Sequence, residues 1–190
     1  NRGLEIHYDG DLPARSGMGS SSCFTVGLLK ALNTLNSKDI QSSQLAKKAI
    51  YFEQKIMKEV VGSQDQIAAS FGGFNKIIFK KNKFSLKRII KKRNIKKLEK
   101  NLVLIYTGIA RTAHKIASSY ASKLSTTKKK YIKSICEHVT EGENLLNSGK
   151  IDDFGNLLNH AWILKKKLSN SISNKKIDEL YNLAIESGAL

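Results

Sequence analysis

A short stretch near the N-terminus combines glycine, serine and an apolar helical pattern in a way that suits phosphate binding. Gly17 and Gly19 lie in a predicted loop, serines fill positions 20–22, and an amphipathic helical pattern continues to about Asn36. Glycine lets backbone amides approach a ligand closely, and serine hydroxyls can pair with the free amides of a first helical turn. Loop, hydroxyls and helix N-terminus together predict an anion site suited to phosphate.

Two familiar phosphate loops do not fit this stretch. A Walker loop requires a lysine directly after its last glycine, and this chain has Ser20 after Gly19. The dinucleotide fingerprint requires a third glycine where this chain has Ser22. A flexible Gly/Ser linker is the remaining alternative, but a linker would not lead directly into a strong amphipathic helix. We therefore favour phosphate binding.

An aspartate at the start of a short predicted helix is the second candidate for chemistry. Gly62 and Ser63 indicate a turn and a helix start, residues 64–70 a short helix, and Gly72 its end. Asp65 therefore lies in the first helical turn, where the helix dipole favours a carboxylate. From these features alone, Asp65 could equally be a helix-capping residue or a residue that takes part in chemistry.

The elements that must position these residues form an α+β pattern. Alternating apolar residues predict a strand at 4–8 that leads into the glycine loop, and a hairpin formed by residues 74–80 and 84–90. A nearly continuous apolar run predicts a buried strand at 101–106. Helices are predicted over residues 21–36, 112–123, 126–148, 151–168 and 174–187.

One further predicted helix carries a carboxylate. It begins after Asp39, and its buried face includes Leu45, Ala49, Phe52 and Ile56. Glu53 lies near the end of this helix. No internal repeat and no long linker interrupt the chain, and Trp162 is expected to anchor the core of the C-terminal helices.

The composition is that of a folded protein with an unusually basic surface. Hydrophobic residues make up 41% of the 190 residues and aromatic residues 7%, while the formal net charge is +17. A charge of this size invites a nucleic-acid interpretation. However, the basic residues are spread over the whole length, arginine is scarce, and few aromatic residues are interleaved for base stacking. We interpret most of this charge as solvated lysine-rich surface that also steers anionic substrates.

The cysteines and the apolar segments indicate neither a redox site nor a membrane anchor. Cys23 and Cys136 have no metal or redox spacing, and we expect both to be reduced and buried, as in a cytosolic protein. The N-terminal residues lack the apolar core of a signal peptide, and no apolar run approaches the roughly 20 residues of a membrane span. The sequence thus predicts a cytoplasmic protein without a membrane partner.

The stretch from Asp11 to Leu32 resembles the second motif of the GHMP kinases, the galacto-, homoserine, mevalonate and phosphomevalonate kinases. The family pattern Pro-x-x-x-Gly-Leu-Gly-Ser-Ser-Ala is matched from Pro13 to Ser22, with methionine in place of leucine and serine in place of alanine. The chain is similar in particular to the sugar kinases that make D-glycero-α-D-manno-heptose 1,7-bisphosphate from the 7-phosphate. Three stretches carry that similarity, DLPARSGMGSSS, VGSQDQIAASFGGFN and LVLIYTGIAR.

The resemblance implies a GHMP kinase-like α+β fold, in which a ribosomal protein S5 domain 2-like part precedes a helix-rich part. Residues 1–80 would form the C-terminal portion of the ATP-binding N-terminal domain, and residues 81–190 the start of a truncated C-terminal domain. The family's first motif and its third, glycine-rich motif have no counterpart in this chain, and there is no initiating methionine. We therefore expect an incomplete internal piece that has little or no kinase activity alone.

The resemblance also implies roles for the residues of the glycine loop. Their backbone amides would wrap the phosphates of ATP, and the residues concerned are Gly17, Met18, Gly19, Ser20, Ser21 and Ser22. The hydroxyl of Ser21 and the carboxylate of Glu53 would hold Mg²⁺. Asp65 would orient or deprotonate the sugar hydroxyl that attacks the γ-phosphate. Arg111, at the end of a predicted strand, is expected either to contact the sugar phosphate or to form a structural salt bridge.

The function implied by the resemblance is ATP-dependent phosphorylation of D-glycero-D-manno-heptose 7-phosphate at its anomeric position. The 1,7-bisphosphate would supply nucleotide-activated heptose for surface polysaccharide. ATP and Mg²⁺ are the implied cofactors, a small sugar phosphate is the implied partner, and a homodimer is left open. Another GHMP kinase acting on fucose, galactose or mevalonate is the first alternative. A basic RNA-binding module is the second, and it would not need Ser21, Glu53 and Asp65 in this arrangement.

Overall fold

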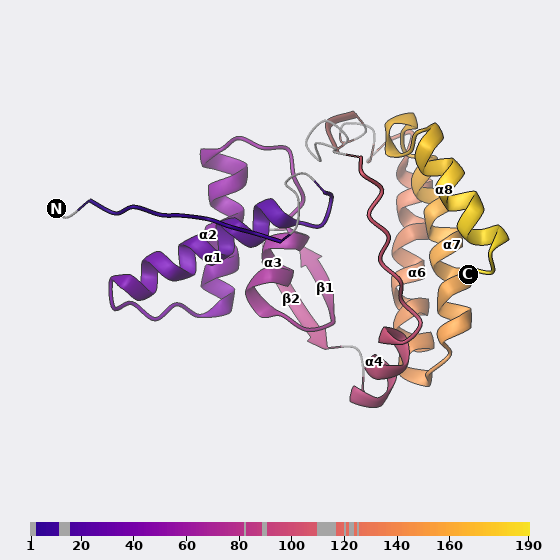
Figure 1. Cartoon of the computed structure of the whole chain (residues 1–190), viewed down its shortest axis with the longest axis horizontal. Coiled ribbons are helices and arrows are strands. Elements are labelled where there is room, and N and C mark those ends of the chain that lie inside the picture. The colour runs from indigo at the N-terminus through magenta and orange to yellow at the C-terminus, as the bar shows by residue number, and fades with distance from the viewer. Residues whose placement is uncertain are drawn as a thin grey trace.

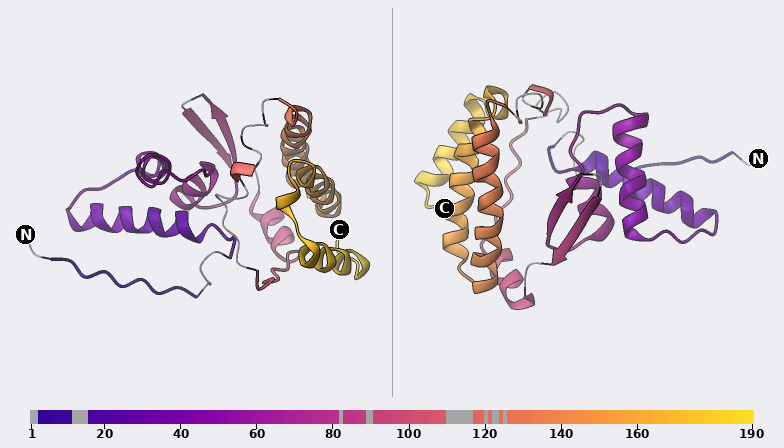
Figure 2. Two further views of the ribbon diagram at one scale, coloured as in Figure 1. Left: turned by 90° about the horizontal axis from the view of Figure 1, so that it is seen from above. Right: turned by 180° about the vertical axis from the view of Figure 1, so that it is seen from behind.

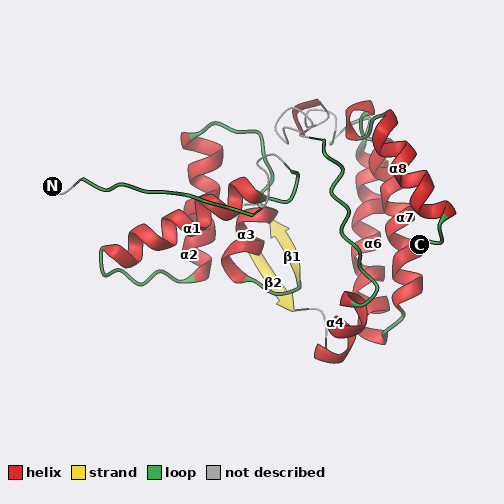
Figure 3. Ribbon diagram, in the orientation of Figure 1, coloured by secondary structure: helices red, strands yellow, loops and turns green. Residues whose placement is uncertain are grey.

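The computed structural model describes residues 3–11, 16–81, 83–88, 91–109, 117–119, 121, 124 and 126–190. Within these ranges the chain is mostly helical and has one antiparallel two-stranded sheet (Figure 1, Figure 3). The sheet lies between three N-terminal helices and a group of C-terminal helices (Figure 1, Figure 2). The predicted combination of a mixed N-terminal part and a helix-rich C-terminal part is what the structure shows.

Three helices build the N-terminal part around one small apolar core. They are α1 (Ser20–Leu35), α2 (Ser42–Tyr51) and α3 (Gln64–Phe71), and a π-helical turn (Phe52–Ile56) extends α2. The core consists of Val26, Ile40, Leu45 and Ala49, with Leu29 and Ala69 packed against it. The three helices are in mutual contact, which places the start of α1 close to the start of α3.

The π-helical turn changes the predicted buried face of the second helix. Leu45 and Ala49 are buried as expected, whereas Ile56 is 58% exposed. The amide of Met57 donates to the carbonyl of Phe52, five residues earlier, so the helix widens here and loses the 3.6-residue period. Continuing the 3.6-residue period of α2 through this turn therefore places Ile56 on the buried face, whereas it is exposed.

The predicted hairpin is confirmed. Strands β1 (Asn75–Lys80) and β2 (Lys83–Arg88) pair antiparallel, with Ile77 opposite Leu86 and Phe79 opposite Phe84. The hairpin follows α3 directly, because Gly72 ends that helix with a φ of 60°. The glycine pair after residue 71 therefore marks the helix end, as the sequence indicates.

The C-terminal part is a group of helices around a second apolar core. Its elements are α4 (Lys92–Glu99), α6 (Lys129–Ser148), α7 (Ile151–Lys166), a 3₁₀ turn (Asn170–Ile172) and α8 (Lys175–Glu186). Gly149, with a φ of 71°, turns the chain from α6 into α7, and the two helices pack side by side (Figure 2). Leu98, Leu146 and Ile151 form the core, and Phe154 packs on it.

Trp162, which the sequence predicts to anchor the C-terminal core, is only partly buried and is not among the residues of the core around Leu146. Its ring lies 6.0 Å from that of Tyr181, which joins α7 to α8. The Tyr181 hydroxyl also donates to Asn159 Oδ1 at 2.5 Å. The division of the chain at residue 80 into two domain portions stays a prediction.

An ionic contact joins the hairpin to the C-terminal helices. Glu143 of α6 is buried and pairs with Lys76 Nζ of β1 at 2.7 Å and Lys87 Nζ of β2 at 2.6 Å. Lys76 and Lys87 face each other across the hairpin, so both ammonium groups reach the same carboxylate. Hydrogen bonds from Lys76 and then Lys87 lower the pKa of Glu143, because they favour its charged form.

Two predicted strands are wrong in the described structure. Residues 4–8 and 101–106 are extended but belong to no strand, and their apolar side chains are exposed, with Val103 reaching 86%. A strand requires backbone partners as well as an apolar sequence, and the described residues offer none to these two segments. The helix predicted at 112–123 falls largely outside the described residues.

Both cysteines are exposed, which contradicts the expectation that they are buried. They are free thiols in the described structure. Cys23 lies on α1 next to the buried Ser22, and successive residues of a helix point about 100° apart, so Cys23 faces away from the core. Across the described helices, none combines the length and the apolar character that a bilayer crossing requires.

Candidate active site

The glycine loop ends at a helix N-terminus whose first amides bond to no described residue. Gly17 and Gly19 have φ values of 79° and 72°, a left-handed conformation that glycine adopts without steric cost. Gly19 precedes α1, and the first backbone bond of the helix runs from Cys23 N to Gly19 O. The amides of residues 20–22 therefore precede the helical hydrogen-bond pattern, at the positive end of the helix dipole.

The serines occupy a different helical position from the one the sequence suggests. A capping hydroxyl must belong to the residue before the helix, and that residue is Gly19, so no side chain in the described structure caps α1. Ser20, Ser21 and Ser22 form the first turn itself. Their backbone amides remain available to a ligand, as the phosphate-loop prediction requires.

Three buried polar residues from three elements meet beside this helix. Ser22 Oγ of α1 donates to Glu53 Oε2 at 3.0 Å, and Gln66 Nε2 of α3 donates to the same oxygen at 2.5 Å. Exposed fractions are 6% for Ser22, 3% for Glu53 and 0% for Gln66. Because Glu53 lies in the π-helical turn after α2, these two hydrogen bonds tie together α1, α2 and α3.

The second oxygen of Glu53 indicates what this group could bind. Glu53 Oε1 is buried and accepts no hydrogen bond from any described residue. A buried carboxylate oxygen without a partner is costly, and a cation would relieve that cost. Oxygen atoms of a carboxylate and of hydroxyl groups are the ligands that Mg²⁺ takes, so the residues present fit that ion.

The number of acidic residues near Glu53 is also compatible with Mg²⁺. Within the described residues, no group of three or more His, Cys, Asp or Glu side chains gathers to form an all-protein metal cage. Magnesium is usually held by one or two carboxylates together with water and substrate phosphates. A single buried carboxylate beside the glycine loop is therefore sufficient for the protein's share of such a site.

Asp65 lies next to the glycine loop. It occupies the first turn of α3 and is exposed. A methyl group placed on Gly19 would lie 3.5 Å from Asp65 Oδ2, so the carboxylate is in contact distance of the loop backbone. The fold thus brings together the loop and the aspartate that the sequence singles out.

The serine that contacts Glu53 is Ser22 and not Ser21, the serine that the sequence pairs with Glu53. Ser21 is exposed, and Ser22 forms the hydrogen bond, because the 100° step of the helix directs adjacent side chains to different sides. Metal binding by Ser21 therefore stays a prediction. Met18 is 44% exposed in the loop, while Pro13 and Arg111 lie outside the described residues.

Gln66 is a site residue that sequence reasoning missed. It is polar and follows Asp65 directly, but its full burial beside Ile67 is a property of the packed structure. The sequence holds a weak signal, since Glu53 and Gln66 are both polar residues within apolar helical faces. Such residues in a core need hydrogen-bond partners, and here they pair with each other.

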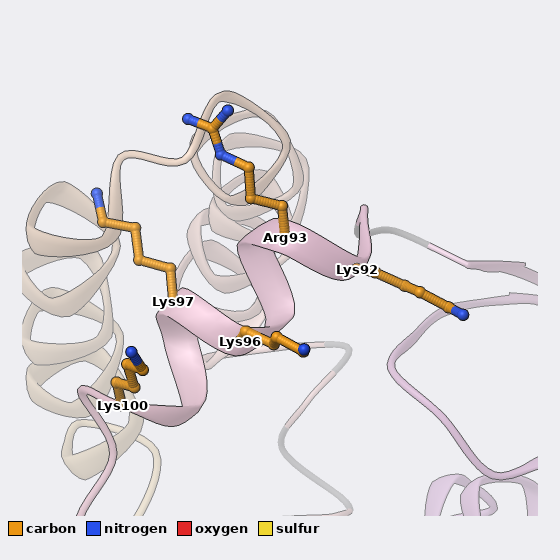
Figure 4. Close-up of a pocket in the computed structure, with 5 residues that line it drawn as sticks. All are labelled: Lys92, Arg93, Lys96, Lys97 and Lys100. Atoms are coloured by element: carbon orange, nitrogen blue, oxygen red, sulfur yellow. The ribbon is translucent and has the colours of Figure 1, made fainter.

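A separate basic surface lies on α4, within the C-terminal part. A shallow hollow of about 510 Å³ is lined by Lys92, Arg93, Lys96, Lys97 and Lys100 (Figure 4). Steps of four residues align Lys92, Lys96 and Lys100 in one row and Arg93 and Lys97 in the neighbouring row, and the two rows together form a basic stripe. The opposite side is attached to the end of α6, where Asn94 Nδ2 donates to Leu146 O at 2.8 Å and Leu98 is buried.

Comparison with known proteins gives the relatives of this chain. Residues 1–73 match the family model of the GHMP kinases N-terminal domain. The chain is 32% identical, over 98% of its length, to the D-glycero-alpha-D-manno-heptose 7-phosphate kinase of Campylobacter jejuni. It is 26% identical, over 96% of its length, to the bifunctional fucokinase/GDP-fucose pyrophosphorylase of Arabidopsis thaliana. It covers 56% of the first of these proteins and 18% of the second.

A solved structure shares the same fold. A D-glycero-D-manno-heptose 1-phosphate kinase from Bacteriodes thetaiotaomicron superposes with a TM-score of 0.68 and 27% identity. The superposition covers 83% of this chain and 46% of that one. The chain thus spans about half the length of the heptose kinases it matches.

Proposed function

We propose that the chain, whose residues 1–73 match the family model of the GHMP kinases N-terminal domain, belongs to that family and forms part of an ATP-dependent sugar kinase. Its acceptor is D-glycero-D-manno-heptose 7-phosphate, and its product is the 1,7-bisphosphate, a precursor of nucleotide-activated heptose for surface polysaccharide. Residues 1–80 form a portion of the ATP-binding domain and residues 81–190 the start of the second domain. The reaction takes place in the cytoplasm.

One observation carries this proposal. Among the described residues, the first amides of α1 have no partner, and neither does Glu53 Oε1. Glu53 is bound to Ser22 in the first turn of α1, and the Asp65 carboxylate lies against Gly19, directly before that turn. Phosphoryl transfer requires a cradle for the phosphates, a metal to neutralise charge, and a group that positions the attacking hydroxyl. The loop, the Glu53 group and Asp65 match these three requirements.

Each residue has a definite part in this reaction. The amides of residues 17–22 bind the phosphate oxygens of ATP, and the helix dipole of α1 supports that binding. Glu53, with a hydroxyl of the serine run, holds Mg²⁺, which supplies charge neutralisation on the phosphates when it is bound. Asp65 accepts a hydrogen bond from the acceptor hydroxyl and so aims its oxygen at the γ-phosphate.

The choice of heptose phosphate rests on the relatives. Two of the similar proteins are named as heptose phosphate kinases and one as a fucokinase. A phosphorylated acceptor also suits a chain with a formal net charge of +17, because positive potential attracts an anionic substrate. Arg111 is the proposed contact to the sugar phosphate.

A substrate panel tests the proposal. The native full-length protein is supplied with ATP and Mg²⁺ and with heptose 7-phosphate, fucose, galactose or mevalonate, and the products are identified by ³¹P NMR. The expected product is the heptose 1,7-bisphosphate. Turnover of fucose, galactose or mevalonate instead would identify the protein as a different kinase of the family. Turnover of none of the four substrates would contradict the proposed kinase function.

RNA binding is the second candidate function, and the basic stripe on α4 is the observation that favours it. All five side chains that line this hollow are cationic, and none is aromatic, so the stripe suits phosphate backbones rather than base stacking. Tight binding of a specific RNA with a steep salt dependence would support this function. Weak binding that is independent of RNA sequence would leave the sugar kinase as the function.

A further inference from the structure

The Glu53 carboxylate is held through only one of its two oxygen atoms. Its two donors among the described residues, Ser22 Oγ and Gln66 Nε2, both reach Oε2, at 3.0 and 2.5 Å. Oε1 is buried and receives no hydrogen bond from the described residues. Buried side-chain oxygens nearly always have a hydrogen-bond partner, so the unpaired Oε1 requires an explanation.

Gln66 is the donor whose own geometry is most restricted. Its side chain is fully buried, and an amide facing a carboxylate oxygen must present its NH₂ group rather than its carbonyl. The carbonyl oxygen, Gln66 Oε1, is therefore turned away from Glu53 Oε2, and it too is buried without a partner among the described residues. The cluster thus contains two unpaired oxygens, which together make the surroundings attractive to a cation.

The torsion that sets the orientation of a glutamate carboxylate is soft. Rotation about this terminal bond has broad, nearly two-fold preferences, so an unrestrained Glu53 could present either oxygen or neither. Two donors on Oε2 remove that freedom. The donors come from α1 and α3, the two helices that also carry the phosphate loop and Asp65.

We propose that Gln66 is a positioning residue, which holds Glu53 through Oε2 and so leaves Oε1 as the oxygen that would bind a divalent cation. Ser22 donates a second hydrogen bond to the same oxygen. This inference rests on the proposed kinase function and adds to it the residue that prepares the metal ligand before metal arrives. Partners of metal ligands commonly change metal affinity by 10- to 100-fold when they are replaced.

Metal binding, rather than turnover, provides the test. The native full-length protein and its Gln66→Met variant are titrated with Mn²⁺ in the presence of ADP, and free Mn²⁺ is measured by its EPR signal. Methionine keeps the length of the side chain and loses the donor. We expect Gln66→Met to raise the Kd for Mn²⁺ by about 10-fold or more. Gln64→Met, an exposed position on the same helix, is the matched control and should stay within about twofold of the native protein.

Repeating the measurement in a Glu53→Gln protein distinguishes an effect of Gln66 on Glu53 from an effect of Gln66 on the stability of the fold. If Gln66 acts through Glu53, then Gln66→Met should weaken Mn²⁺ binding no further in a Glu53→Gln protein. Equal losses in both backgrounds would mean that Gln66 only supports the fold, and this would overturn the proposal. Should Gln66→Met fail to fold, Gln66→Asn, which keeps the amide but is one methylene too short, gives the same comparison.

The outcomes also distinguish this inference from the function on which it rests. Native Mn²⁺–ADP binding that is unchanged by Gln66→Met and Gln66→Asn would overturn the role of Gln66 and leave the kinase proposal standing. Failure of the native protein to bind Mn²⁺–ADP would overturn both.

Discussion

The carboxylate of Asp65 lies against the backbone of Gly19, within 3.5 Å of the position that a β-carbon would occupy. Gly19 ends the glycine loop and Asp65 lies in the first turn of α3. This contact therefore joins the two candidate regions that the sequence indicates separately. The Gly19 φ of 72° is part of the relationship, because it directs the loop into α1. A change at Gly19 should therefore affect both the loop and its neighbour.

The first prediction concerns Gly19→Ala. Alanine at a φ of 72° costs about 1–2 kcal/mol of stability, because left-handed backbone is unfavourable for residues with a β-carbon. The methyl group would fit in ordinary contact with Asp65, so strain in the loop is the main effect. We expect the free energy of unfolding in urea to fall by that amount and the affinity for ATP to decrease.

Gly27→Ala is the control for that change. Gly27 lies within α1 and is exposed, and a β-carbon added there would meet no atom of another element within 4 Å. Alanine has a higher helix propensity than glycine, so this variant should gain about 0.5–1 kcal/mol and keep its ATP affinity. Equal effects of the two substitutions would contradict a special conformation at Gly19.

Elements with local signals could be predicted from the sequence, whereas elements that depend on distant partners could not. The helical extent of α1, the glycines after α3 and the alternation of the hairpin are all set by neighbouring residues, whereas the buried face of α1 contains Ser22, Thr25 and Val26 instead of the apolar row predicted to pack. The segments at 4–8 and 101–106 have equally apolar sequences but are unpaired in the described structure. Strand pairing is a non-local property, and the π-helical turn at Phe52 likewise has no sequence signal that we recognise.

The sequence predicts the residue types of the candidate site but not their contacts. It singles out the serine run, Glu53 and Asp65, and their roles stay predictions. It does not determine that Ser22 rather than Ser21 faces Glu53, because that depends on the angular position of each residue on α1. Nor does it show that Gln66 is buried, since this follows from how α3 packs on α1 and α2.

The second prediction is a pH dependence at the junction between the hairpin and α6. Lys76 and Lys87 lower the folded-state pKa of Glu143 below its ordinary value of 4.5. A lowered folded pKa stabilises the protein above the unfolded value, and that contribution is lost as the pH falls from 4.5 through the folded pKa. Urea unfolding at a series of pH values should show this loss in the native protein and a smaller one in Glu143→Gln. Glu99→Gln, at an exposed position on α4, should keep the native pH profile.

The third prediction separates the α4 stripe from the kinase site. The double variant Lys92→Gln/Lys96→Gln removes two exposed cations of the stripe and should leave sugar kinase activity within about twofold of native. Its affinity for single-stranded RNA should depend less steeply on salt. The slope of log K against log salt concentration should become shallower by about 1.4, because each lost phosphate contact removes about 0.7 from it. Lys80→Gln/Lys81→Gln is the control for charge alone. A large loss of kinase activity in the α4 variant would show that the stripe belongs to the substrate site.

The last prediction tests the role of Asp65 directly. In Asp65→Asn the side chain keeps its size and its place beside Gly19, but it loses the charge that accepts the hydrogen bond of the attacking hydroxyl. We expect kcat to fall by at least about 100-fold, with little change in the Kd for Mg²⁺–ATP, since general-base and positioning groups contribute about 10²- to 10⁴-fold. Asp152→Asn is the matched control, because Asp152 is also an exposed aspartate in a first helical turn, that of α7. Loss of ATP binding in Asp65→Asn would show that the aspartate supports the loop instead, and native turnover would remove Asp65 from the reaction altogether.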